Sequence, residues 1–218
     1  MDYGHRPATR AHPAAEITRR VADLVGAVLL LGLLSVPMLV VAMAVWADDG
    51  GPPLFRQERV GRGRTRFTML KFRTMTSGVS DAGLRELIAR ELRGENTMVN
   101  GSAKLSADER VTPLGAFLRR TSLDELPQLI NVVRGEMALV GPRPCLSWEA
   151  EMFPAQYASR FSVRPGLTGL WQVSGRSTLG TLEMLQLDVR YVRTRTLRSD
   201  ASILLRTVPV LLRQDGAQ

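Results

Sequence analysis

The chain has 218 residues, with 29 lysines and arginines against 21 acidic residues, and its net charge of +8 indicates an anionic partner: membrane, phosphate or nucleic acid. This length allows one domain, or one domain with an attached membrane element, and a hydrophobic content of 44% excludes a disordered chain. The single Cys145 excludes an intramolecular disulfide, and two histidines, both near the N-terminus, argue against a zinc centre or a Ser-His-Asp triad.

The first predicted element is an apolar segment, residues 24–47, in which 24 consecutive residues carry no charge. It exceeds the roughly 20 residues that a helix needs to cross a bilayer. Pro37 lies near its middle and removes one helical hydrogen bond, so a kink or break is predicted there. Three interpretations compete: a signal peptide, a straight membrane-spanning helix, and a re-entrant hairpin that returns to the face it entered.

Basic residues flank this segment on both sides. Arg19 and Arg20 precede it, and a longer series follows it: Arg56, Arg59, Arg62, Arg64, Arg66, Lys71 and Arg73. Positive charges mark the cytoplasmic side of a membrane segment, so both flanks have cytoplasmic character. This pattern favours the re-entrant hairpin kinked at Pro37, with Ser35 as a candidate partner for the backbone groups freed by the break. The segment is also longer than the apolar part of a signal peptide.

The rest of the chain predicts a mostly helical α+β domain. Alternating residues at 66–72, after a Gly-Arg-Gly turn, predict a short β-hairpin, and the polar residues 94–107 predict a loop. Four segments have helical or amphipathic periodicity: 84–93, 112–140, 184–192 and 197–213. The last of these is basic and amphipathic, which is typical either of a helix in the membrane interface or of a helix packed against the domain.

Two adjacent carboxylates, Asp124 and Glu125, follow a pair of arginines and precede an apolar run. One interpretation is structural, because Ser122 and Glu125 have the spacing of a helix capping box. That box does not require Asp124, and Pro127 restricts a helix that begins at Ser122. Neighbouring residues on a helix point about 100° apart, so the carboxylates suit different tasks: nucleophile or base, and orienting group or metal ligand.

Two further segments are rich in glycine, proline and arginine. Residues 140–144 (VGPRP) contain Arg143, whose guanidinium is the kind of fork that binds phosphate. Residues 164–176 (RPGLTGLWQVSGR) have the composition to offer backbone amides and arginines to an anion. An ordinary turn-rich loop is the alternative for each. The absence of a G-x-x-x-x-G-K-[ST] sequence excludes a P-loop nucleotide hydrolase.

Four motifs occur in an order that resembles the bacterial sugar transferases of the monotopic phosphoglycosyl transferase family: residues 71–75, 121–128, 139–144 and 164–176. The resemblance extends over about residues 21–213. It implies an enzyme that transfers sugar-1-phosphate from a UDP-sugar to polyprenyl (undecaprenyl) phosphate, giving polyprenyl diphosphate-sugar and UMP. This would be the first membrane step in assembling an exopolysaccharide, a capsule, an O-antigen or a glycoprotein glycan. The implied location is the bacterial inner membrane, with the catalytic domain facing the cytoplasm.

The resemblance also assigns roles to individual residues. Asp124 matches the family's nucleophile, with Mg²⁺ beside it, and Glu125 matches the partner carboxylate. A carboxylate that attacks phosphorus forms an acyl phosphate, which splits the exchange into two displacements. The phosphate- and substrate-binding residues implied by the resemblance are Arg119, Arg143, Lys71, Arg73 and Arg176. At the kink the family often has Ser-Pro, whereas here Val36 separates Ser35 from Pro37.

The expected architecture therefore has three parts: a tail (1–20), a re-entrant membrane helix (21–49) and a cytoplasmic catalytic domain (50–218) with interfacial amphipathic helices. The expected partners are a UDP-sugar, polyprenyl phosphate and the phospholipid membrane. The family includes dimers, so a homodimer is one open alternative for the oligomeric state, and nucleic acid is not an expected partner. The alternative is a non-catalytic, membrane-docked adaptor for anionic lipid or nucleic acid, which leaves the Asp-Glu pair unexplained.

Overall fold

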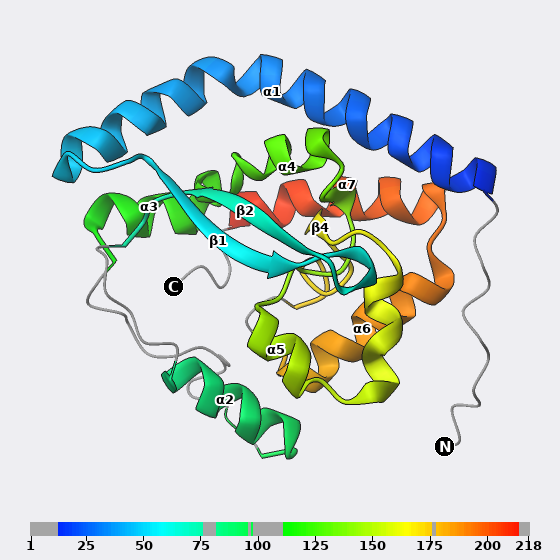
Figure 1. The fold of residues 1–218 in the computed structure, drawn as a ribbon. Helices are drawn as coiled ribbons and strands as arrows, with labels where there is room; N and C mark the ends of the chain where they lie inside the picture. The colour runs from blue at the N-terminus through cyan, green and yellow to red at the C-terminus, as the bar shows by residue number, and fades with distance from the viewer. Residues whose placement is uncertain (1–12, 76–81, 96, 98–110, 176–177, 214–218) are drawn as a thin grey trace.

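The computed structural model describes residues 13–75, 82–95, 97, 111–175 and 178–213 (Figure 1). Its helices and strands are α1 (Pro13–Asp49), β1 (Leu54–Val60), β2 (Arg66–Phe72), α2 (Ala82–Leu92), α3 (Pro113–Thr121), α4 (Gln128–Arg134), β3 (Ala138–Val140), α5 (Ser147–Met152), β4 (Gly166–Thr168), α6 (Thr181–Thr194) and α7 (Leu197–Arg213). Short 3-10 helices lie between them: η1 (Arg62–Arg64), η2 (Leu123–Glu125) and η3 (Ala155–Ser162). The prediction of a mostly helical α+β fold is confirmed.

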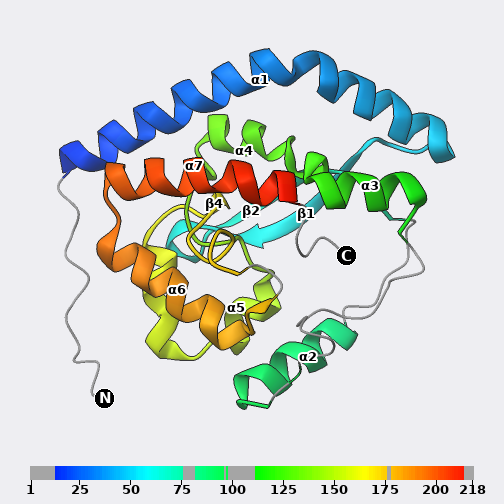
Figure 2. The same ribbon diagram turned by 180° about the vertical axis from the view of Figure 1, so that it is seen from behind.

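Helix α1 has 37 residues and stays helical through Pro37, so the alternative of a break in the helix at this residue is wrong. It begins at Pro13, inside the segment expected to be a tail, and residues 1–12 lie outside the described chain. Figures 1 and 2 show α1 arching over the rest of the molecule, with α4 and α7 beneath it. The Ser35 hydroxyl donates to the Gly32 carbonyl (2.8 Å). The next carbonyl, that of Leu33, receives no helical hydrogen bond from Pro37, because proline has no backbone N–H.

The inner face of this arch is part of the protein core, and its outer face is apolar and exposed. Ala27 packs against the central cluster, and Val45 packs against Phe72 and Leu118 in a second cluster. The outward residues are Leu29, Leu33, Val36, Leu39, Val40 and Met43. Within the described chain, α1 is the helix long and apolar enough to cross a membrane. Its exposed face is consistent with membrane association.

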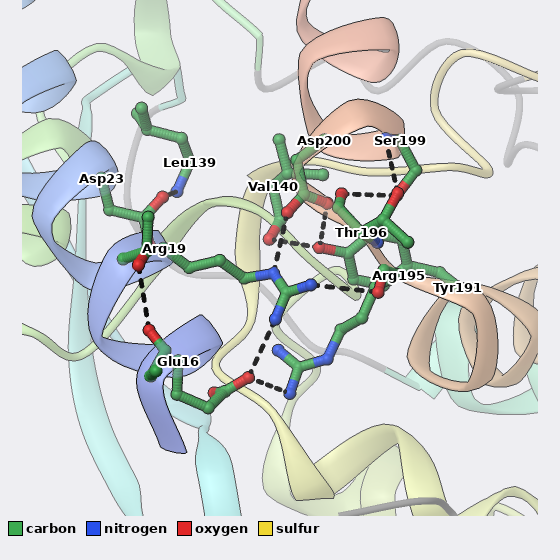
Figure 3. Close-up of polar contacts among 12 residues, drawn as sticks. Glu16, Arg19, Asp23, Leu139, Val140, Tyr191, Arg195, Thr196, Ser199 and Asp200 are labelled. Atoms are coloured by element: carbon green, nitrogen blue, oxygen red, sulfur yellow. Dashed lines mark hydrogen bonds and ion pairs between the residues drawn. The ribbon is translucent and has the colours of Figure 1, made fainter. Parts of the chain in front are cut away.

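Polar side chains anchor the N-terminal part of α1 to the start of α7 (Figure 3). Arg19 donates through Nε to Asp200 (3.1 Å) and through Nη2 to the Arg195 carbonyl (3.0 Å). Glu16 forms ion pairs with both arginines. A cavity of about 180 Å³ lies beneath this anchor, and none of the predicted catalytic residues lines it.

The same anchor holds the short strand β3 by its backbone (Figure 3). The Asp23 carboxylate accepts the Leu139 N–H at 3.0 Å. The Tyr191 hydroxyl lies within hydrogen-bond distance of the Val140 carbonyl (3.1 Å) and of Asp200 (2.9 Å). Helix α1 is therefore attached to β3, which leads directly into the loop of residues 141–145 that carries Arg143.

The predicted β-hairpin is confirmed. β1 and β2 pair antiparallel from Leu54 opposite Phe72 to Val60 opposite Arg66. The second sheet pairs β3 and β4 in parallel, which requires the crossover through α5 and η3. Residues 138–140 are thus a strand, so the prediction that 112–140 is mainly helical is wrong at its end, because pairing with a distant strand decides the conformation there.

The remaining predicted helices are confirmed as α2, α6 and α7. Glu91 of α2 accepts the Thr181 N–H (2.9 Å) and hydroxyl, and so caps the N-terminus of α6 from another helix. On α7, Ile203 is buried while Leu205 is 74% exposed, so the helix packs against the domain and presents an apolar outer face. Most of the predicted loop 94–107 lies outside the described residues.

Candidate active site

The Asp-Glu pair lies in η2, between α3 and α4. Ser122 ends α3 in the left-handed conformation (φ 56°, ψ 18°), and its side chain makes no helix-capping hydrogen bond. The capping-box interpretation is therefore wrong, because an N-cap residue needs extended backbone and Ser122 instead closes the preceding helix. Pro127 directly precedes α4. Neither carboxylate is explained as a cap.

Asp124 is buried, with 6% of its surface exposed, and Glu125 is more open. Lys71, from β2, lies between the two, with Nζ 2.7 Å from Glu125 Oε1 and 3.6 Å from Asp124 Oδ2. Burial raises the pKa of Asp124 above its ordinary value, Lys71 and Arg119 oppose that rise, and Glu125 adds to it. The structure thus combines a desolvated carboxylate with cations that stabilise its charge.

The fully buried Asn131 of α4 binds the backbone of β2 next to Lys71. Its Oδ1 accepts the Leu70 N–H (3.0 Å), and its Nδ2 donates to the Thr68 carbonyl (2.7 Å) and to Glu136 (2.6 Å). One side chain therefore joins the edge of β2 to α4, the helix that follows Asp124 and Glu125 (the dyad). Asn131 was not predicted from the sequence, where the available signal was a polar residue inside the apolar run of α4.

The C-terminal end of α4 is held by arginines. Arg20 of α1 donates to the carbonyls of Val132 (2.7 Å) and Val133 (2.9 Å) in the last turn of the helix, and the Val132 carbonyl also accepts the Gly135 N–H (3.0 Å). Arg164 donates to the carbonyl of Gly135 (2.8 Å), the left-handed residue that ends α4. Arg164 is thus part of the scaffold, and α1 fixes the orientation of the helix behind the dyad.

Two of the predicted phosphate-binding residues, Arg119 and Arg73, lie in different parts of the structure. Arg119, in the last turn of α3, donates through Nε to the Thr74 hydroxyl (2.9 Å) and lowers the pKa of Asp124. Arg73 lies at the other end of α1, where Nη2 donates to the Val45 carbonyl (3.4 Å). The structure therefore brings Lys71 and Arg119 to Asp124 and Glu125, and it places Arg73 against α1.

Arg143 lies in a second loop, residues 141–145, where its side chain is exposed and its guanidinium stands 5.9 Å from the ring centroid of Trp171. The Gly166 N–H donates to the Pro142 carbonyl (2.8 Å). The expectation that residues 164–176 present their amides to an anion is wrong for Gly166, because this N–H joins the two loops. Arg176 lies outside the described residues.

The donor set around Asp124 fits a magnesium ion shared with substrate. Within the described ranges, no three His, Cys, Asp or Glu side chains are grouped as metal ligands. Mg²⁺ usually binds one or two carboxylates together with substrate phosphates and waters. Asp124 and Glu125 would supply the protein carboxylates for such an ion, and its other ligands would come from substrate and water.

A buried ion pair beneath the Arg143 loop was also not predicted from the sequence. Arg160 of η3 and Asp188 of α6 are 2.8 Å apart, and each side chain is 2% exposed. Asp188 lies on the apolar stripe of α6, three residues after Leu185 and four before Val192. A carboxylate among core positions was the available signal.

Comparison with known proteins identifies the family of this chain. The bacterial sugar transferase family model matches residues 14–214. The chain is 42% identical to the UDP-galactose-lipid carrier transferase of Erwinia amylovora, over 95% of this chain and 43% of that protein. It is 41% identical to the UDP-glucose:undecaprenyl-phosphate glucose-1-phosphate transferase of Caulobacter vibrioides (94% and 73%). It is 38% identical to the exopolysaccharide production protein ExoY of Sinorhizobium fredii (94% and 90%).

Several curated relatives are longer, and the chain spans less than half of the Erwinia protein and of the undecaprenyl-phosphate galactose phosphotransferase of Salmonella typhimurium. The match to the family model nevertheless covers almost the whole chain, including nearly all of α1 and the loops of the candidate site. The ExoY protein is of similar extent, since the chain covers 90% of it. The chain belongs to the bacterial sugar transferase family.

Proposed function

We propose that this protein transfers sugar-1-phosphate from a UDP-sugar to undecaprenyl phosphate, releasing UMP and starting a surface glycan such as an exopolysaccharide. The observation that carries the proposal is the buried Asp124, with Glu125 and Lys71 beside it. Relatives named for this transfer, to undecaprenyl phosphate in the Caulobacter and Salmonella proteins, support the choice of substrates.

Asp124 acts as the nucleophile in this mechanism. Its carboxylate oxygen attacks the phosphorus that carries the sugar, and the bond from that phosphorus to the bridging oxygen breaks, so UMP leaves with the electron pair. The sugar-phosphate remains on Asp124 as an acyl phosphate. A phosphate oxygen of undecaprenyl phosphate then attacks the same phosphorus and releases the carboxylate. The burial of Asp124 supports this role, because excluding water limits hydrolysis of the intermediate.

The neighbouring cations offset the charge of the diphosphate. Lys71 and Arg119 lie at the dyad, and Arg143 offers a guanidinium fork from the second loop. A magnesium ion held by Asp124 and Glu125 would supply further positive charge to the diphosphate oxygens. Arg73 and Arg176 remain candidates for substrate binding.

We place α1 in the membrane as a re-entrant element, with the domain on the cytoplasmic face of the inner membrane. Two observations support this placement: both ends of α1 contact the same domain, through Arg19 and Val45, and its outward face is apolar. Undecaprenyl phosphate carries its phosphate at the membrane surface, so the dyad must lie close to that surface. The apolar outer face of α7, including Leu205, suits an interfacial helix.

The catalytic test uses the purified protein with undecaprenyl phosphate and a panel of sugar nucleotides that includes UDP-glucose and UDP-galactose. Asp124→Asn is expected to lower UMP release by more than about 1,000-fold, because the nucleophile is lost. Glu86→Gln, which changes an exposed carboxylate, should leave the rate unchanged. Mass spectrometry of wild-type protein incubated without acceptor should find a sugar-phosphate on Asp124. Chelation of Mg²⁺ should stop turnover.

Three results would contradict the proposed function. The first is wild-type protein that releases no UMP from any sugar nucleotide in the panel. The second is an Asp124→Asn variant that keeps substantial turnover. The third, which addresses the two-step mechanism, is UMP release that strictly requires the acceptor, with no trapped adduct.

The topology is tested by thiol labelling in sealed vesicles. The buried Cys145 is first replaced (Cys145→Ser), and single cysteines are introduced at the exposed positions Ala14 and Arg62, on either side of the apolar segment. A re-entrant α1 places both cysteines on one face, so a membrane-impermeant reagent should label both or neither. Labelling of one alone in intact vesicles would show that α1 spans the membrane.

A further inference from the structure

The backbone of the Arg143 loop is held through four consecutive carbonyl groups, those of residues 142–145. Their donors, in order, are Gly166 N–H (2.8 Å), Arg160 Nη2 (2.9 Å), Arg59 Nη1 (3.3 Å) and Val60 N–H (2.9 Å). Pro142 and Pro144 have no N–H to satisfy. The surrounding protein therefore fixes this backbone, and the side chain of Arg143 extends from it to the surface.

Arg160 is the unusual donor in this set, because it is a buried charge. Its Nε and Nη2 lie 3.1 and 2.8 Å from Asp188 Oδ2, and its guanidinium stands 5.0 Å from the ring of Phe153 and 5.2 Å from that of Phe161. Replacing a buried ion pair by apolar residues is often neutral or stabilising, since desolvation opposes the attraction. An apolar pair could fill this space, but it could not donate to the Arg143 carbonyl.

We propose that Arg160 and Asp188 form a positioning pair that fixes the Arg143 guanidinium for the diphosphate of the sugar nucleotide. The inference rests on the proposed function, which gives Arg143 its ligand. Asp188 orients Arg160, and Arg160 Nη2 is shared between Asp188 and the carbonyl of Arg143 itself. With the backbone held, the guanidinium faces Trp171 before substrate arrives. Less conformational freedom is then lost on binding.

The test variant is Arg160→Lys, which keeps a positive charge beside Asp188 but lacks the planar fork that reaches the carboxylate and the carbonyl together. We expect the KM for the UDP-sugar to rise roughly three- to tenfold, with the KM for undecaprenyl phosphate unchanged. In an Arg143→Ala background the same substitution should have no further effect, because Arg160 acts through Arg143.

Arg19→Lys is the matched control. Arg19 also joins an aspartate to a backbone carbonyl, through Nε at 3.1 Å from Asp200 and Nη2 at 3.0 Å from the Arg195 carbonyl. That carbonyl lies outside the Arg143 loop, and Arg19 reaches β3 indirectly, through Asp200 and Tyr191, so the KM for the UDP-sugar should rise much less than in Arg160→Lys. A rise in KM equal to that of Arg160→Lys would show a general effect of loosening the fold and would overturn the proposal.

Thermal unfolding establishes that each variant is folded. If Arg160→Lys fails to fold, the double variant Arg160→Met with Asp188→Leu removes both charges and keeps the packing, and it should show the same rise in KM. A folded Arg160→Lys or double variant with the wild-type KM for the UDP-sugar would overturn the proposal. So would a rise in this KM on Arg160→Lys substitution that is equal in the wild-type and Arg143→Ala backgrounds.

Calorimetric titration with UDP separates this proposal from the proposed function. Weaker UDP binding by Arg160→Lys supports the positioning pair. Wild-type protein that neither binds UDP nor releases UMP refutes both proposals together. Wild-type protein that binds UDP and turns over, beside an Arg160→Lys variant that binds UDP equally well, refutes the positioning pair alone.

Discussion

Lys71 is the clearest single point at which to perturb the site. Its ammonium lies 2.7 Å from Glu125 Oε1 and 3.6 Å from Asp124 Oδ2, and it reaches them from a strand that the buried Asn131 holds in place. Lys71→Met keeps most of the apolar stem and removes the charge. The two adjacent carboxylates then repel each other without the cation between them, and an incoming diphosphate meets more negative charge.

The expected loss follows from these contacts. A hydrogen bond to a charged group contributes about 1.5–3 kcal/mol, and each 1.36 kcal/mol changes a rate about tenfold. The side chain of Glu125 is about one third exposed, so solvent screening places the loss in the lower half of this range. We therefore expect kcat/KM for UMP release to fall roughly 10- to 50-fold in Lys71→Met.

The assay is UMP release at saturating undecaprenyl phosphate, with thermal unfolding measured in parallel. Arg66→Met is the matched control in the same strand: Arg66 pairs with Glu58 on the surface, where both side chains are more than half exposed. Such pairs contribute little, so its rate should stay at the wild-type value. A folded Lys71→Met variant within twofold of wild type would refute the reasoning that Lys71 serves the dyad.

Three further predictions concern the surroundings of the site. Asn131→Leu leaves the buried Leu70 N–H unsatisfied and removes the bond to the Thr68 carbonyl, so it should lower the free energy of unfolding by about 2–4 kcal/mol, measured by chemical denaturation; a loss below 1 kcal/mol would contradict its linking role. Glu91→Ala removes the cap of α6 and should lower it by only about 0.5–2 kcal/mol in the same measurement, so an effect equal to that of Asn131→Leu would be inconsistent with a capping role. Burial raises the pKa of Asp188 to about 6, against the opposing effects of Arg160 and Arg143, so its carboxylate is ionised above that pH and gains a proton below it. The KM for the UDP-sugar should therefore rise as the pH falls from 7 to 5, and a rise of the same size in Arg143→Ala would exclude the positioning pair as its cause.

The local sequence was sufficient to predict those elements whose conformation depends on residues close together in the chain. The turn glycines and the alternation after them predicted the hairpin, and the uncharged stretch predicted a long apolar helix. The Asp-Glu pair was visible because Asp124 had no local structural purpose. The capping box was wrong for the same local reason, since its spacing does not distinguish a residue that begins a helix from one that ends the helix before it.

The sequence by itself determined the long apolar helix and the hairpin, and it singled out the adjacent Asp124 and Glu125, because composition and near-neighbour spacing decide these. Only the tertiary structure decided which cations lie beside these carboxylates and which lie elsewhere. In the fold, Lys71 contacts Glu125, which lies 54 residues away in the sequence. Arg160 lies beneath Arg143, and Arg73 contacts the C-terminal end of α1. Arginine and lysine have the same charge wherever they lie in a sequence. The buried carboxylates and carbonyls of distant segments determine which of them bind substrate and which hold the fold together.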